Sequence, residues 1–192
     1  MEDFLQTDLS ARVEELRAQG YDVVIAANLP YYITTPILFK IFESEADIAA
    51  ITVMMQREVA LRLAAAPGTA DYGAFTVYLT WHCEAERLFD VPPECFMPRP
   101  KVTSSVVRLT PRTAPLCPVR DEALMFRCVK AAFAQRRKTL SNALGNGLGS
   151  LKPLVLPALE RAGIDPRARG ETLSCADFAR LSDALSGLLT EN

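Results

Sequence analysis

A short apolar segment that leads directly into a turn and a helix start restricts the fold of this chain most. Residues 22–27 (DVVIAA) have the composition of a buried parallel strand. Residues 28–31 (NLPY) follow, and Thr35 and Pro36 then suit a helix N-cap and a first helical turn. Residues 28–31 are therefore expected at the carboxyl end of a strand, where open α/β sheets bind ligands.

The same order of elements occurs a second time. Residues 49–56 predict another buried strand, and residues 57–66 a helix closed by Pro67 and Gly68. A short amphipathic helix over residues 10–20 precedes both units. Strand and helix in alternation predict a parallel sheet with right-handed crossovers.

The middle of the chain predicts an antiparallel closure of this sheet. Residues 74–82 alternate apolar and aromatic side chains and predict a strand, which residues 87–91 extend. Residues 92–100 contain too many prolines for a helix or a central strand, so they predict an ordered loop. Residues 102–109 predict the returning strand, paired antiparallel.

The composition changes at residues 111–118, where three prolines mark a linker. Helices are expected after it at residues 121–135, 152–162 and 174–189, with a basic helix or turn over residues 136–144. The chain therefore divides into an α/β domain over residues 1–112 and a small all-α domain over residues 119–192.

Charge and cysteine usage narrow the functional classes. Residues 97–138 carry ten basic and two acidic residues, although the whole chain has a net charge of −2, and this asymmetry indicates a polyanion contact or a solvated basic face. Five scattered cysteines without a CxxC spacing, and the single His82, favour neither a disulfide framework nor a metal site. With no membrane-length apolar run and no signal pattern, a cytoplasmic protein with reduced thiols is expected.

The turn at residues 28–31 offers groups that suit a planar base with an exocyclic amine. The Asn28 carboxamide can donate and accept, Pro30 leaves neighbouring backbone carbonyls free to accept, and Tyr31 supplies a flat ring. The alternative is a structural Asn-Pro turn whose tyrosine packs on the sheet.

Three motifs in this order are similar to those of one family. They are N-L-P-Y at residues 28–31, F-x-P-x-P-K-V-x-S at residues 96–104 and F-x-Q-R-R-K-T-L at residues 133–140. The chain resembles the small-subunit ribosomal RNA adenine N6-dimethyltransferases (KsgA-type) over essentially all its residues. This implies a partial Rossmann-like class I methyltransferase sheet, S-adenosyl-L-methionine as cofactor, and small-subunit rRNA as partner, without a membrane or a metal.

The resemblance also implies roles for individual residues. Asn28 and the Leu29 carbonyl accept from the amine of the target adenine, within the Asn28-Leu29-Pro30-Tyr31 turn, and Tyr31 and Phe96 clamp the flipped base. Asp3, with Asn28, contacts the cofactor. Four basic residues face RNA phosphates: Lys101, Arg136, Arg137 and Lys138. The reaction implied is dimethylation of adjacent adenines near the 3′ end of small-subunit rRNA during ribosome biogenesis.

One departure from the family pattern is large. Its members begin with three further strands and a Gly-rich cofactor loop, and no G-x-G precedes residue 28 here. We therefore expect an N-terminally truncated member whose strand at residues 22–27 presents an unpaired edge, with weak cofactor binding and a tendency to associate. The alternatives are a large-subunit rRNA adenine methyltransferase of the macrolide-resistance type, and a non-catalytic RNA-binding fragment that acts in ribosome assembly.

Overall fold

The computed structural model describes residues 3–191, so Met1 and Glu2, where the truncated sequence was expected to begin, lie outside the described residues. Within this range the chain forms two compact units. The first contains residues 3–64 and 82–113, and the second contains residues 65–81 and 114–191. Residues 65–81, which the sequence placed with the α/β domain, thus belong to the second unit.

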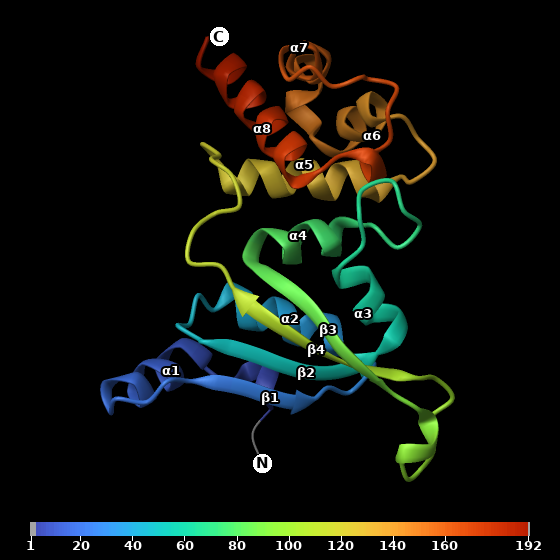
Figure 1. The fold of residues 1–192 in the computed structure, drawn as a ribbon. Coiled ribbons are helices and arrows are strands. Elements are labelled where there is room, and N and C mark those ends of the chain that lie inside the picture. Colours follow the sequence, from blue (N-terminus) through green and yellow to red (C-terminus); the bar gives the residue numbers. More distant parts are fainter. Residues whose placement is uncertain (1–2, 192) are drawn as a thin grey trace. The chain divides into compact units, whose positions relative to one another are not determined.

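A four-stranded sheet forms the centre of the first unit, in the order β1-β2-β4-β3 (Figure 1). The strands are β1 (Val24–Asn28), β2 (Ala50–Gln56), β3 (Cys83–Val91) and β4 (Ser104–Pro111). β1 and β2 are parallel, with Asn28 opposite Met54, and β4 is antiparallel to both β2 and β3. The predicted parallel pair and its antiparallel closure are confirmed.

Three α-helices and two short 3₁₀ helices accompany this sheet. They are η1 (Phe4–Gln6), α1 (Leu9–Ala18), α2 (Thr34–Glu43), α3 (Arg57–Leu63) and η2 (Pro93–Cys95). Thr35 was expected to cap α2 but lies inside it. The helix begins earlier because the Pro30 carbonyl accepts from both the Ile33 amide and the Thr34 hydroxyl, each at 3.1 Å.

The strand predicted at residues 74–82 is wrong, because these residues form helix α4 (Ala74–His82). The segment is apolar on nearly every side, so its pattern does not separate a buried helix from a buried strand. Val77 and Trp81 contribute to the core of the second unit, and this tertiary burial overrides their strand propensity. The actual strand, β3, starts immediately afterwards at Cys83.

The second unit is helical. Besides α4 it contains α5 (Glu122–Ala134), α6 (Leu140–Gly147), η3 (Gly149–Leu154), α7 (Val155–Arg161), η4 (Gly170–Thr172) and α8 (Cys175–Thr190). Its core includes fully buried Met125, Leu144 and Phe178. Residues 136–139 form a turn and a bend, and the basic segment predicted as helix or turn is thus a turn followed by α6.

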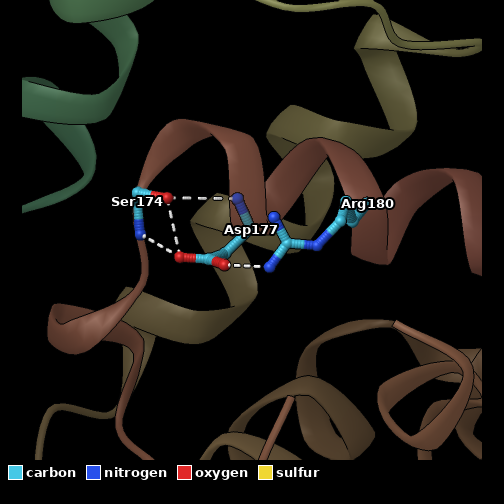
Figure 2. Close-up of polar contacts among 3 residues, drawn as sticks. All are labelled: Ser174, Asp177 and Arg180. Atoms are coloured by element: carbon cyan, nitrogen blue, oxygen red, sulfur yellow. Dashed lines mark hydrogen bonds and ion pairs between the residues drawn. The ribbon is translucent and has the colours of Figure 1, made fainter. Parts of the chain in front are cut away.

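Helix α8 begins with a capping box formed by Ser174 and Asp177 (Figure 2). The Ser174 hydroxyl accepts from the Asp177 amide at 3.2 Å, and Asp177 Oδ2 accepts from the Ser174 amide at 2.8 Å. Arg180 pairs with the same carboxylate. Partial burial would raise the pKa of Asp177, but the Ser174 hydrogen bonds and the Arg180 charge outweigh it and lower that pKa.

Candidate functional site

An open pocket of about 300 Å³ lies at the carboxyl end of β1. Its lining comes from two segments that are far apart in sequence: Asn28, Leu29, Pro30 and Tyr31 from the turn after β1, and Phe96, Pro98 and Pro100 from the Pro-rich loop. The structure thus brings together five residues that the sequence assigned to one catalytic site.

The backbone of the turn is held in place by hydrogen bonds. The Leu29 amide donates to the Met54 carbonyl at 2.9 Å, which extends the pairing of β1 and β2 by one residue. The Pro30 carbonyl is already used by α2, as described above. Among residues 3–191, neither the Asn28 carboxamide nor the Leu29 carbonyl has a hydrogen-bond partner. Two acceptors therefore remain available beside the pocket.

Ser104 fixes the ring of Tyr31. The Tyr31 hydroxyl and the Ser104 hydroxyl are 2.6 Å apart, and Ser104 is fully buried at the start of β4. Because a buried hydroxyl needs a partner, this bond restricts the half-buried Tyr31 ring to one position on the pocket wall. The sequence reasoning gave Ser104 no role, although it is the last residue of the F-x-P-x-P-K-V-x-S motif.

Asp90 joins the elements behind the Pro-rich loop. It accepts from the Ser105 hydroxyl at 2.6 Å and from Arg87 at 2.8 Å, and Arg57 Nε lies 3.3 Å from its second oxygen. The Ser105 hydrogen bond, followed by that of Arg87, lowers the pKa of Asp90 below its ordinary value. The Arg57 amide also donates to the Thr103 carbonyl at 3.0 Å. Together these contacts anchor the end of the loop to β3 and α3.

The Pro-rich loop is braced along its length. The Cys95 and Phe96 amides donate to the Pro92 and Pro93 carbonyls at 3.1 and 3.2 Å. Arg99 pairs with Glu94 across the loop. Because its prolines also restrict the backbone, the loop presents Phe96 to the pocket in a fixed position.

Asp3 does not line this pocket. It is exposed and caps η1, where its Oδ1 accepts from the Leu5 amide at 3.0 Å. Its second carboxylate oxygen has no partner among the described residues. Asp3 can therefore still accept from a ligand amine, as the cofactor role requires.

The basic residues proposed to contact RNA have different surroundings. Lys101 is exposed next to the pocket-lining Pro100, and within residues 3–191 it makes no ion pair or side-chain hydrogen bond. Arg137 and Lys138 are similarly unpaired in the turn between α5 and α6, which belongs to the second unit. Arg136, in the same turn, donates to the Ala70 and Tyr72 carbonyls at 3.4 Å.

Part of the basic charge in the middle of the chain is neutralised by acidic residues that precede it. Arg108 of β4 lies 3.9 Å from Glu86 of β3, and Arg112, which directly follows β4, lies 3.0 Å from Glu84 of β3. The charge asymmetry of the sequence thus overstates the free positive charge of the folded chain. Lys101, which directly follows the pocket-lining Pro100, has no acidic partner within residues 3–191.

Residues 3–191 contain no group of three or more His, Cys, Asp or Glu side chains placed to hold a metal ion. None of the helices in this range has the length and apolar character needed to cross a bilayer.

Comparison with solved structures identifies the class of fold. A dimethyladenosine transferase from Plasmodium falciparum superposes with a TM-score of 0.73 at 24% identity, over 83% of this chain and 65% of that one. The 23S rRNA methyltransferase ErmE superposes with a TM-score of 0.60 at 25% identity, over 96% of this chain and 70% of that one. The α/β unit therefore has the Rossmann-like fold of methyltransferases.

Sequence comparison identifies the family. The family model described as "Ribosomal RNA adenine dimethylase" matches residues 1–186, and the chain belongs to that family. Ribosomal RNA small subunit methyltransferase A of Geobacillus thermodenitrificans (strain NG80-2) is 50% identical over 190 residues, which are 97% of this chain and 65% of the relative. The protein of the same name from Bacillus cytotoxicus is 47% identical over 95% of this chain and 64% of the relative. The chain thus spans slightly less than two thirds of these relatives.

Proposed function

We propose that this chain carries the target-adenine site of a small-subunit rRNA adenine N6,N6-dimethyltransferase. The observation that supports this most strongly is the pocket formed by the N-L-P-Y turn and Phe96, with two unused acceptors at its edge. The family match and the names of the curated relatives support the same reaction. The proposed substrate is a pair of adjacent adenines near the 3′ end of small-subunit rRNA, methylated in the cytoplasm during ribosome biogenesis.

Binding of the target base is the first task of this site. A stacked base does not present its exocyclic amine to an enzyme, so it must leave the stack at a cost of a few kcal/mol. Stacking on an aromatic ring returns about 1–3 kcal/mol per base. Tyr31, held by Ser104, and Phe96, held by the braced loop, provide two such rings. We infer that together they offset the cost of unstacking.

Orientation of the amine is the second task. In our proposal the Asn28 carboxamide oxygen and the Leu29 carbonyl accept its two hydrogens. These bonds direct the nitrogen lone pair out of the plane of the base and hold it in line for attack. After one methyl transfer a single N–H remains, so one of the two acceptors suffices for the second transfer. No strong base is needed until the nitrogen has become cationic.

The cofactor assignment is part of the same proposal. S-adenosyl-L-methionine, when bound, supplies the electrophilic methyl group. Asp3 is proposed to accept from its adenine amine, because one carboxylate oxygen of Asp3 remains without a partner. Asn28 is proposed to lie against both the cofactor and the target base. Lys101, Arg137 and Lys138 are proposed to contact RNA phosphates, with Arg136 beside them.

Transfer of labelled methyl groups from S-adenosyl-L-methionine to unmodified small ribosomal subunits tests the proposal. The expected result is incorporation into adenine that is lost in Asn28→Ala and absent with large subunits. Incorporation into large subunits instead would support the macrolide-resistance type of enzyme. Salt-dependent binding to small subunits without any transfer would support a non-catalytic RNA-binding role.

A further inference from the structure

The Pro-rich loop carries two sets of side chains with different surroundings. Alternate residues line the pocket: Phe96, Pro98 and Pro100. Met97 and Arg99, which alternate with them, and Lys101, which follows them, are not part of the lining and are exposed to solvent. Beside the pocket the loop therefore presents one apolar and two basic side chains to solvent.

Met97 is the apolar residue of this exposed set. It is 97% exposed, more than any other large hydrophobic residue within residues 3–191. A single exposed apolar side chain is common on a protein surface, so its surroundings must indicate any role. Prolines and two backbone hydrogen bonds restrain the loop around it, and Arg99 pairs with Glu94 beside it. Met97 is thus presented to solvent in a fixed place.

The charges beside Met97 indicate the kind of partner. Arg99 is already neutralised by Glu94, whereas Lys101 has no partner among residues 3–191. Lys101, an unpaired cation, follows the apolar Met97 by four residues. An apolar side chain close to a cation suits a nucleic-acid strand, in which a phosphate flanks each base. A purely apolar partner surface would leave Lys101 without a counter-charge.

We propose that Met97 is a wedge residue, which occupies the space that the target base leaves in the RNA stack when that base enters the pocket. The inference rests on the proposed function, since it requires an extruded base. Extrusion leaves the two neighbouring bases without a stacking partner. Proteins that open base stacks insert apolar side chains, methionine among them, between base steps. Met97 is placed for this because it is exposed and directly follows Phe96, which lines the pocket.

Binding measurements with two probes test the wedge. The first probe is an RNA hairpin with two adjacent adenines inside its stack, and the second is adenosine 5′-monophosphate, which has no neighbouring base. Met97→Ala is expected to weaken hairpin binding about tenfold, equivalent to ~1.4 kcal/mol, and to leave nucleotide binding unchanged. Met97→Leu, which keeps an apolar tip of similar size, should retain hairpin binding.

Two further variants separate the wedge from general RNA affinity. Lys101→Ala should reduce the salt dependence of hairpin binding by about one phosphate contact, whereas Met97→Ala should leave that dependence unchanged. Tyr21→Ala removes another exposed side chain, 61% exposed, just before β1 and at the end of that strand opposite Asn28. It should have no effect on either probe.

The outcomes distinguish the wedge from the function on which it rests. Equal losses for both probes in Met97→Ala would mean that Met97 belongs to the pocket itself and would overturn the wedge. Unchanged hairpin binding in Met97→Ala would also overturn it, while the base-binding function stands. If the unmodified chain binds neither probe, the proposed function itself fails.

Discussion

Single residues at the pocket act through the partners that hold them. Tyr31 was assigned from its ring, but the structure shows that its hydroxyl determines where the ring lies, through the buried Ser104. Asn28 shows the opposite case, because its carboxamide has no partner within residues 3–191 and remains available to a ligand. A sequence motif identifies both residue types, but only coordinates separate a restrained ring from an available acceptor.

The Tyr31–Ser104 bond predicts a coupled pair of substitutions. Tyr31→Phe leaves the buried Ser104 hydroxyl unpaired and should lower the free energy of unfolding by about 1–3 kcal/mol. Ser104→Ala should cost about 1 kcal/mol, because the half-exposed Tyr31 hydroxyl can turn to water. The double variant should resemble Ser104→Ala alone. Urea unfolding of the four proteins measures this coupling.

Tyr32→Phe is the matched control for this pair, because Tyr32 is 85% exposed and neighbours Tyr31. It should leave the free energy of unfolding unchanged. Additive effects of the two site substitutions would show that the hydrogen bond does not restrain the ring.

At the scale of elements, close packing and helix capping determine where a substitution in a helix lowers stability. Helices α5 and α6 approach each other at Gly147, where an added Cβ would lie 2.5 Å from Ala131 Cβ and 2.9 Å from its Cα. Gly145, on the same helix, has ordinary space, with Lys152 Cγ at 3.5 Å. The close approach of the two helices thus requires glycine at position 147, whereas position 145 has room for a larger residue.

Alanine at these two glycines should change stability in opposite directions. Gly147→Ala forces the backbones of α5 and α6 apart and should cost about 1–3 kcal/mol. Gly145→Ala removes a poor helix former from an uncrowded position and should stabilise by up to about 1 kcal/mol. Thermal unfolding of both variants is the measurement. Stabilisation by both would mean that α5 and α6 are not in close contact at Gly147.

The capping box of α8 predicts a pH-dependent contribution to stability. Because the pKa of Asp177 is lowered in the folded chain, its stabilisation is complete above the unfolded pKa of about 3.9 and is lost as pH falls through the folded value. Ser174→Ala should cost about 1 kcal/mol at neutral pH. That cost should shrink below pH ~3.9 as the carboxylate is protonated.

Trp81 fluorescence during urea unfolding reports this effect, since Trp81 lies in the core of the same helical unit. Ser186→Ala, a change within α8 away from its cap, is the control and should show no pH-dependent difference from the unmodified chain. If Ser174→Ala lowers the free energy of unfolding equally at neutral pH and below pH ~3.9, the Asp177 charge has no role in the cap.

At the scale of the whole molecule, we expect association to involve the edge of the sheet formed by β1. β1 is an edge strand in the described chain, and Val24 on it is 62% exposed. This confirms the expectation that the strand after residue 22 presents a free edge. Free edges expose backbone donors and acceptors that can pair with a second copy.

Val24→Lys should therefore reduce concentration-dependent association of the chain, because a charged side chain disfavours pairing along that edge. Sedimentation velocity over a range of protein concentrations measures it. Leu156→Lys places the same charge on an exposed apolar residue of the helical unit, 53% exposed, and should leave association unchanged. If only Leu156→Lys disrupts association, β1 is not the contact.

The sequence by itself determined the strand–turn–helix order, the antiparallel closure, the pocket motifs and the helix at the C-terminal end, α8. These depend on local periodicity, turn residues and motif spacing, which neighbouring residues largely decide. Tertiary structure alone decided that residues 74–82 form a helix, because an evenly apolar segment takes the conformation that its burial requires. It also decided that Ser104 positions Tyr31, that Glu86 pairs with Arg108 of β4 and that Glu84 pairs with Arg112 just after β4, since such contacts depend on strand pairing across many residues.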